Sequence, residues 1–177
     1  MAHPQPPPPA LLLVAIFSRH EAALDWARHR VQTSWGDVRL ASPRFDHSET
    51  RYYHSQMGDG LQKQFLVVDG FYDAAGLAAT KLQSNAWEAE LAASGRFVEP
   101  RPLNIDPGYL TLTKLVLASA KDRAHRIYLT DGIYAEECLY YLERRWQARP
   151  WTYPDYQRAD FQAFFVEARE LLKRLMK

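Results

Sequence analysis

The sequence predicts an α+β fold: a ferredoxin-like βαββαβ core with a mostly antiparallel sheet, extended by a β-hairpin and followed by a C-terminal amphipathic helix. Two observations carry this prediction. Short apolar runs bounded by turn residues alternate with two longer segments of helical periodicity in the first part of the chain. From Asp160 to Met176, apolar side chains then recur every three or four positions, as on one face of a helix.

The N-terminal part supplies the first strand and the first helix of this plan. Residues 10–17 are apolar throughout and follow a proline run, which favours a central strand. Ser18 and Glu21 match a capping box at the start of a helix over residues 20–34. Two further strands are expected at residues 38–45 and 61–68.

A second helix is expected over residues 74–93. Its apolar face would consist of Leu77, Ala78, Leu82, Ala86 and Ala89. Leu112–Ala120 is short and apolar and is interpreted as a third helix. The remaining expected elements are an extended segment at 97–105, a hairpin of His125–Leu129 and Ile133–Tyr141, a strand at Arg145–Trp151 and the helix Asp160–Met176.

The register of the hairpin follows from its turn. Thr130-Asp131-Gly132 suits a three-residue turn with Gly in the left-handed position, which pairs Tyr128 with Tyr134 and Arg126 with Glu136. A two-residue Asp-Gly turn is the alternative, and it would set apolar residues against polar ones. The favoured register yields an arginine–carboxylate pair beside two tyrosines. This is either a ligand-binding surface or a cross-strand ion pair worth about 0.2–1 kcal/mol.

Composition and charge exclude several classes of protein. The chain has 22 Lys+Arg against 21 Asp+Glu, which argues against a dedicated surface for duplex nucleic acid. A single cysteine, Cys138, excludes an internal disulfide and a Cys-rich zinc site, and it fits a cytoplasmic setting. The apolar run at 10–17 is too short to span a bilayer. Residues 1–9 are expected to form a disordered Pro-rich tail, and residues 10–177 a single domain.

Basic residues gather in the second half of the chain. Lys114 and Lys121 lie seven positions apart and would project from one side of the expected third helix, with Arg126 following soon after. Asp106 falls in an Asp-Pro-Gly-Tyr segment that reads as an irregular turn, where site residues are frequent. Several cations with a few carboxylates would suit a phosphorylated ligand, which could bring a bridging Mg²⁺. The competing interpretation is a set of helix caps and surface ion pairs.

These patterns give a set of candidate site residues. The expected ligand-binding residues are Lys81, Asn85, Lys114, Lys121, Arg126 and Tyr134. The catalytic candidates are Asp106, His125 and Glu136, of which His125 could donate a proton near neutral pH. No metal ligands are predicted, because the spacing of Asp46, His47, Glu49 and His54 matches no known pattern.

Familiar catalytic and nucleotide-binding motifs are missing from the sequence. It contains neither G-x-x-x-x-G-K-[ST] nor G-x-G-x-x-G, so a Walker-type or Rossmann phosphate loop is excluded. Ser119 lacks the flanking glycines of a nucleophile elbow. Cys138 lies in the expected hairpin and is interpreted as a packed residue.

Longer motifs carry a resemblance. The stretch "DPGYLTLTKLVLASAKDRAHRIYLTDGIYAEE", followed by "PWTYPDY", closely resembles an uncharacterised prokaryotic family, domain-of-unknown-function family 4416, and the likeness extends over about Leu11 to Leu175. Earlier positions that match the family pattern are Tyr52, Tyr53, Met57, Gly58, Lys81, Asn85, Glu88, Arg101 and Asn104. Gln56 stands where the pattern has Glu, so this chain would be impaired if that carboxylate is catalytic. The resemblance implies no established activity.

Two functional hypotheses follow. The first is binding, with turnover left open, of a phosphorylated or nucleotide-like small molecule. The alternative is a non-catalytic protein-interaction or scaffold module, suggested by the aromatic content of 13%, the Pro-rich tail and the apolar C-terminal helix. RNA binding on the sheet would rest on Phe65 and Tyr128 alone, and the balanced charge counts against it.

Overall fold

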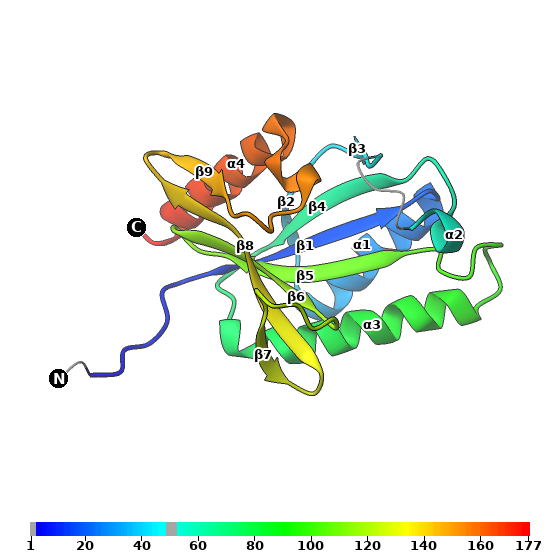
Figure 1. The fold of residues 1–177 in the computed structure, drawn as a ribbon, viewed down its shortest axis with the longest axis horizontal. Helices are drawn as coiled ribbons and strands as arrows, with labels where there is room; N and C mark the ends of the chain where they lie inside the picture. Colours follow the sequence, from blue (N-terminus) through cyan, green and yellow to red (C-terminus); the bar gives the residue numbers. More distant parts are fainter. Residues whose placement is uncertain (1–2, 49–52) are drawn as a thin grey trace.

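The computed structural model describes residues 3–48 and 53–177 of the 177-residue chain. The elements of the first half are β1 (Leu11–Ser18), α1 (Glu21–Trp35), β2 (Val38–Ala41), β3 (Phe45–Asp46), α2 (His54–Met57), β4 (Gln62–Val68), the 3₁₀ turn η1 (Ala74–Gly76) and α3 (Leu77–Ala93). Those of the second half are β5 (Asn104–Leu110), β6 (Lys114–Ser119), β7 (Ile127–Thr130), β8 (Ile133–Leu142), β9 (Arg145–Ala148), the 3₁₀ turn η2 (Pro154–Gln157) and α4 (Ala159–Leu175) (Figure 1).

The described strands form one nine-stranded sheet in the order β2-β4-β1-β5-β6-β8-β7, with β3 beside β4 and β9 beside β8. All of these strand pairs are antiparallel. The predicted α+β class, the mostly antiparallel sheet and the C-terminal helix are therefore confirmed. Among the described residues, no helix is long and apolar enough to cross a membrane.

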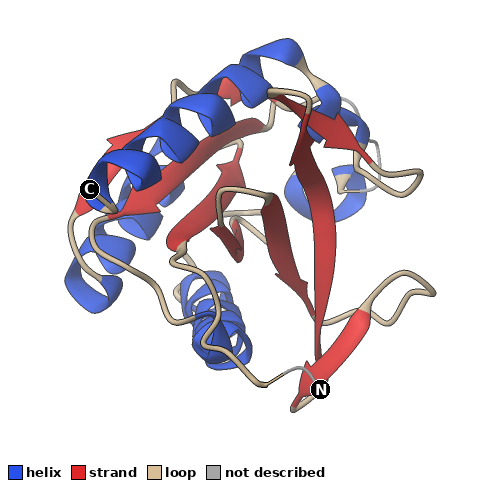
Figure 2. Cartoon of the chain, turned by 90° about the vertical axis from the view of Figure 1, so that its left-hand side faces the viewer, coloured by secondary structure: helices blue, strands red, loops and turns tan. Residues whose placement is uncertain are grey.

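The sheet separates two hydrophobic cores, because successive side chains of a strand point to opposite faces. On one face, Leu11 and Leu13 of β1 pack with Phe161 and Phe165 of α4. On the other face, the alternate residues of β1 pack against α1 and α3. Figure 2 shows the strands between helices that lie at the outside of the molecule. The regular apolar stripe of α4 explains why its position could be predicted.

The prediction of a third helix at Leu112–Ala120 is wrong. Most of this segment forms strand β6, which lies between β5 and β8. A short apolar run does not distinguish a buried strand from a buried helix by periodicity alone, and here two neighbouring strands supply its backbone partners. The consequence for the site is large, because a strand advances about 3.3 Å per residue. Lys114 and Lys121 therefore project from places roughly 20 Å apart along the chain, not from one side of a helix.

The Asp-Pro-Gly-Tyr segment was also misinterpreted as an irregular turn, since residues 106–109 lie within β5. Two residue types permit this. Gly108 lets β6 approach closely, because a Cβ atom there would lie 2.2 Å from the carbonyl oxygen of Val116. Pro107 pairs with Val14 of β1 at a position whose backbone N faces the β6 side, where no ladder bond is lost.

Two smaller expectations need correction. Ser18 is the last residue of β1, and its hydroxyl accepts from the backbone N–H of His20 and donates to the carbonyl of Pro102 (2.6 Å), so there is no capping box. The buried face of α3 is Leu77, Ala78, Lys81, Ser84, Trp87 and Leu91. Three residues predicted for that face, Leu82, Ala86 and Ala89, are exposed. Helix α3 thus turns a lysine and a serine toward the sheet.

The hairpin pairing is confirmed away from the turn, where Tyr128 faces Tyr134 and Ile127 faces Ala135. The turn itself was predicted wrongly. Asp131 and Gly132 both have positive φ values of 50° and 74°, as in a two-residue turn. A register shift between Tyr128 and Thr130 then restores the pairing that a three-residue turn would give.

Candidate functional site

The site begins where the sheet divides. Strands β5 and β6 are paired only from Gly108 to Leu110 of β5. Beyond Gly108, β5 continues along β1 as far as Asn104, while β6 continues along β8 to Ser119. Figure 1 shows the two sets of strands diverging, with β1, β4 and β5 running to one side and β6, β7 and β8 to another.

Side chains of α3 replace the missing strand at this division. The carbonyl oxygen of Ile105 accepts a hydrogen bond from the Lys81 ammonium (2.7 Å) and another from the Ser84 hydroxyl (3.2 Å). The N–H of Ile105 donates to the carboxylate of Glu88 (2.8 Å). Lys81, Ser84 and Glu88 follow one another at spacings of three and four, so a single helical stripe satisfies both backbone groups of one strand residue.

Lys81 also neutralises a carboxylate at the edge of β5. Its ammonium lies 2.9 Å from Asp106, and the amide of Asn104 donates to the other oxygen of Asp106 at 2.6 Å. Burial alone would raise the pKa of Asp106, but Lys81, Lys63 and Asn104 outweigh it and hold that pKa below its ordinary value. Asp106 is therefore an ionised hydrogen-bond acceptor at neutral pH.

Glu88 has the opposite balance. Burial raises its pKa, and the neighbouring Lys81 and Arg101 lower it only in part, so the pKa of Glu88 lies above its ordinary value. Arg101 donates to Glu88 at 3.0 Å and also to the side chain of Asn104. This network fixes the start of β5 against α3.

A cavity of about 440 Å³ lies at the division of the sheet. Its charged lining residues are Lys63, Lys81, Arg101, Lys121, Arg123, Arg126, Asp106, Glu136 and Asp155. Six Lys or Arg side chains thus face three carboxylates, in a chain whose formal charge is only +1. A second, more open depression of about 390 Å³ borders it, and Asn85 and Arg101 line both.

At the inner end of the cavity the charges are paired and surrounded by rings. The ammonium of Lys63 lies 2.6 Å from the carboxylate of Asp155, and both side chains are buried. The same ammonium lies 4.5 Å from the ring centroid of Tyr156 and 5.5 Å from that of Phe17. His47 contacts Asp155 and packs on Phe17.

One wall of the cavity is built around Glu136 of β8, which is only 2% exposed. Its carboxylate accepts from Arg126 at 2.7 Å. Arg126 further donates to Ser119 (2.7 Å), to the carbonyl of Lys121 (2.8 Å) and to the Tyr153 hydroxyl (2.5 Å). Arg126 therefore uses four of its five N–H groups on the protein itself.

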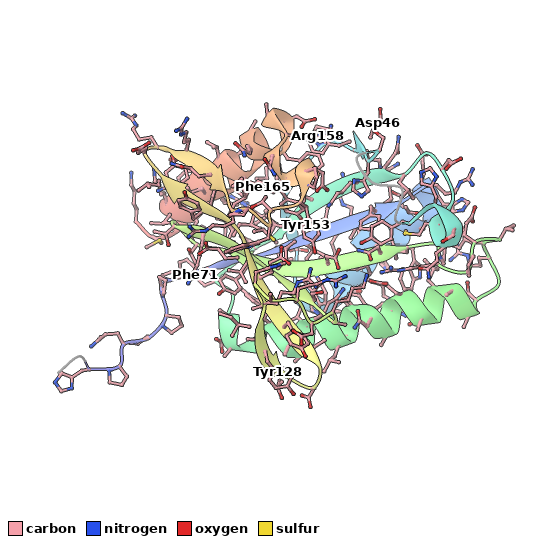
Figure 3. The ribbon with its side chains drawn as sticks, viewed as in Figure 1. Asp46, Phe71, Tyr128, Tyr153, Arg158 and Phe165 are labelled. Atoms are coloured by element: carbon pink, nitrogen blue, oxygen red, sulfur yellow. The ribbon has the colours of Figure 1, made fainter. Side chains whose placement is uncertain are left out.

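Tyr153 brings the segment before η2 over the sheet, and Figure 3 shows it near the middle of the molecule. Burial and the neighbouring Glu136 raise the pKa of Tyr153 well above its ordinary value, so its phenol is protonated at neutral pH. Burial would lower the pKa of Arg126, but its hydrogen bond to Glu136 raises it. This wall therefore holds a fixed ion pair of Arg126 and Glu136.

The outer rim of the cavity is formed by the segment that comes after β6 in the chain. Lys121 and Arg123 are exposed residues of the segment between β6 and β7, and both line the cavity. Within the described part of the chain, the guanidinium of Arg123 forms no hydrogen bond or ion pair. Its charge is therefore available to a ligand, whereas those of Lys63, Lys81 and Arg126 are already balanced by carboxylates.

Most predicted ligand-binding residues do gather at the cavity. Lys81, Asn85, Lys121 and Arg126 line it, as do the catalytic candidates Asp106 and Glu136.

Three candidates lie elsewhere. Lys114 is at the far end of β6, opposite Tyr140. Tyr134 packs edge-on against Tyr128, with ring centroids 5.4 Å apart. His125 is outside the lining, although its Nε2 lies 3.2 Å from Glu136, and its ring stacks on Trp151. Lys114 was predicted from the expected third helix, and Tyr134 from the hairpin face that carries Arg126 and Glu136. His125 was predicted because it directly precedes Arg126.

The sequence interpretation missed Lys63, Arg123, Tyr153 and Tyr156. A signal for Lys63 existed, because it shares the period-two parity of Phe65 and Val67 and so points to the same buried face of β4. Tyr153 and Tyr156 lie in the "WTYPDY" segment, which entered the sequence analysis only as part of the family resemblance. Arg123 had no distinguishing pattern.

Among residues 3–48 and 53–177, no group of three or more His, Cys, Asp or Glu could hold a metal ion. Of the histidine cluster, His47 contacts Asp155 and His54 contacts Asp59. Glu49, like Tyr52 of the family pattern, lies outside the described residues. Cys138 is fully buried, and burial with the nearby Glu136 raises its thiol pKa well above the ordinary value, which disfavours a nucleophilic thiolate.

A family model described as a domain of unknown function, DUF4416, matches residues 8–172. The chain is a DUF4416 protein. No curated protein and no solved structure matches it. The DUF4416 match covers every strand and all but the end of α4, so the divided sheet and its cavity lie within the family region. Gln56, the departure from the family pattern, lines the second depression and not the main cavity.

Proposed function

We propose that this DUF4416 protein binds a phosphorylated, nucleotide-like small molecule in the cavity at the division of the sheet. The observation that carries the proposal is the excess of three positive charges on the lining of a cavity of about 440 Å³. Ligand pockets commonly measure about 300–1,000 Å³, so the space suits a small molecule. Cationic side chains in such a space favour an anion.

The available charges indicate where the anion would bind. Lys63, Lys81 and Arg126 already hold Asp155, Asp106 and Glu136, and Arg101 holds Glu88, which leaves Arg123 of the rim segment as the cationic end. Arg123 supplies a planar fork for phosphate oxygens, and Lys121 lies two residues before it. The remaining N–H of Arg126 lies on the adjoining wall.

A magnesium ion would have to arrive with the ligand. The described residues hold no cluster of three metal-binding side chains, and both oxygens of Asp106 are engaged by Lys81 and Asn104. Phosphate oxygens would therefore supply most of the ligands of a bridging Mg²⁺. Turnover would require a role for Asp106 or Glu136, and each holds a cation in this structure, so the proposal is one of binding.

The test is thermal unfolding of the purified chain with nucleotides, sugar phosphates and inorganic phosphate, each with and without Mg²⁺. A ligand at about 100 times its dissociation constant adds about 2.7 kcal/mol of stability, a shift of several degrees for a chain of this size. Arg123→Gln and Lys121→Gln should reduce the shift. Lys114→Gln is the matched control, because Lys114 is a lysine of the same strand-and-loop segment outside the cavity.

The outcomes separate clearly. A shift that survives in Lys114→Gln and disappears in Arg123→Gln supports the proposal. If no phosphorylated compound shifts the unfolding temperature, or if all three variants behave alike, the cavity is not a phosphate site.

The alternative, a protein-interaction module, is favoured by one specific observation. β7 is an edge strand of the sheet, and its apolar residues Ile127, Tyr128 and Leu129 are 72%, 58% and 40% exposed. Figure 3 shows Tyr128 near the outer end of the hairpin. An exposed apolar edge can accept a further strand. This function predicts a complex that grows with concentration in sedimentation experiments and that Ile127→Lys abolishes.

For the architecture, we propose that β1, α1, β2, β4, α3 and β5 form a ferredoxin-like core within a single cytoplasmic domain. Supporting this, the four strands lie in the order β2-β4-β1-β5, all antiparallel, and each of the two helices connects a strand to one that lies two places away. Strands β6 to β9 would then be the hairpin extension that carries the rim of the cavity.

A further inference from the structure

We infer that the inner end of the cavity binds an uncharged planar group carrying a hydrogen-bonding atom, and that the hydroxyl of Tyr156 is its partner. The inference rests on the proposed function and makes it more specific. The ligand would be a phosphate ester with a neutral polar ring, as in a nucleoside monophosphate, and not a simple sugar phosphate.

Tyr156 carries the first observation. It lines the cavity, is 1% exposed, and its hydroxyl oxygen has no hydrogen-bond partner in the described part of the protein. A buried hydroxyl without a partner is costly, so native structures rarely keep one without a reason. The buried indole N–H of Trp146 also lacks a partner among the described residues, but Trp146 does not line the cavity. The position of Tyr156 on the cavity wall points to a ligand atom as its missing partner.

The neighbouring ion pair decides the charge of the group that binds there. Lys63 and Asp155 lie 2.6 Å apart, and each residue is 4% exposed. A charged ligand group beside them would have to compete for one partner and leave the other buried without its counter-charge. An uncharged group avoids that cost. The inner end therefore selects a neutral polar group, whereas the rim at Arg123 selects the anion.

The shape of the inner end favours a ring. Phe17 and Tyr53 line it with ring centroids 5.1 Å apart in an edge-to-face arrangement, and the ring of Tyr156 completes the aromatic lining. Aromatic walls bind flat groups by stacking or edge contact. Asn85 lines the cavity as well, and its amide forms no hydrogen bond within the described residues, so it offers a second neutral donor and acceptor.

The experiment compares the chain with its Tyr156→Phe variant. Isothermal titration would use four nucleoside 5′-monophosphates, ribose 5-phosphate and inorganic phosphate as probes. For the wild type, we expect at least one nucleoside monophosphate to bind ten or more times more tightly than ribose 5-phosphate. Tyr156→Phe should weaken that nucleotide about tenfold, as for the loss of one hydrogen bond, and leave ribose 5-phosphate unchanged.

A second readout comes from the ligand-free protein. Since the hydroxyl has no partner, its removal should leave the unfolding temperature unchanged or raise it. Tyr134→Phe, on a tyrosine outside the cavity, is the control and should not alter nucleotide affinity.

Equal nucleotide affinity in wild type and Tyr156→Phe would overturn the inference, as would a lower unfolding temperature of ligand-free Tyr156→Phe. Equal binding of ribose 5-phosphate and nucleotides to the wild type would overturn it while leaving the proposed phosphate site intact. If no phosphorylated probe binds the wild type, the proposed function itself fails.

Discussion

Lys81 joins the fold to the candidate site. Its ammonium, at 4% exposure for the residue, satisfies a backbone carbonyl of β5 and neutralises Asp106 on the cavity wall. A buried charge of this kind is tolerated only because each of its neighbours is an acceptor. The same residue therefore holds α3 against the open edge of β5 and sets the charge of the cavity.

We expect Lys81→Met to destabilise the protein by about 3 kcal/mol, because it removes one partner of a buried pair and leaves Asp106 without its counter-charge and the Ile105 carbonyl without its shorter hydrogen bond. Lys114→Met, on a half-exposed lysine outside the cavity, should change stability by less than about 0.5 kcal/mol. Urea unfolding of both variants measures the difference. Similar stabilities for the two variants would show that Lys81 is not a structural cation.

The lowered pKa of Asp106 predicts an acid-sensitive contribution to stability. A carboxyl group whose pKa is lower in the folded state stabilises the protein above its ordinary value of about 3.9, and this stabilisation is lost as pH falls through the folded-state pKa. Asp106→Asn should thus lower stability at neutral pH and flatten its decline below about pH 4. Glu88 has a raised pKa, so Glu88→Gln should not flatten that decline.

Urea midpoints measured from pH 3 to pH 7 for the wild type, Asp106→Asn and Glu88→Gln would check this. Parallel curves for the wild type and Asp106→Asn would contradict it.

At the scale of elements, the sequence was informative where one physical signal dominated. The apolar stripe of α4 and the unbroken apolar run of β1 predicted both elements, and the matching of apolar residues predicted the pairing of Tyr128 with Tyr134. It was uninformative where a partner far along the chain decided the outcome. β6 is a strand because β5 and β8 flank it, and the local periodicity of the sequence does not indicate these neighbours.

The division of the sheet could not be predicted for the same reason. It depends on where β5 stops pairing with β6, and on α3 presenting Lys81 and Glu88 to the strand edge that is left. Six of the predicted site residues reached the cavity because they come from the segments that border this division. Lys114 did not, since its placement required the helix that β6 replaced.

Gly108 tests this account of the elements. An alanine Cβ there would lie 2.2 Å from the Val116 carbonyl oxygen and 2.7 Å from a methyl of Leu117, so β5 and β6 would have to separate. We expect Gly108→Ala to cost about 3 kcal/mol, which lowers the unfolding temperature by roughly 8 °C. Gly76→Ala is the control, because the nearest atom to its Cβ would be the Tyr72 hydroxyl at 3.7 Å. That variant should be neutral or slightly stabilising in thermal unfolding, and equal losses in both would refute the close approach.

Over the whole molecule, the charge is nearly balanced, yet the cavity lining carries six cations against three carboxylates. Ligand binding and folding should therefore respond differently to salt. The screening length shortens from about 10 Å at 0.1 M to about 3 Å at 1 M salt, which weakens the attraction of the exposed rim for an anion. The buried pairs Lys63–Asp155 and Arg126–Glu136 are screened far less.

We expect the unfolding temperature of the ligand-free protein to change little between 0.05 and 0.5 M NaCl (roughly one decade of salt), while the increase caused by a bound phosphate compound shrinks several-fold. Arg123→Gln should show a smaller increase at low salt and a weaker dependence on salt, because one exposed cation of the rim is lost. Lys114→Gln should retain the wild-type dependence. A ligand-induced increase that is insensitive to salt would mean that neutral contacts at the inner end, and not the cationic rim, dominate binding.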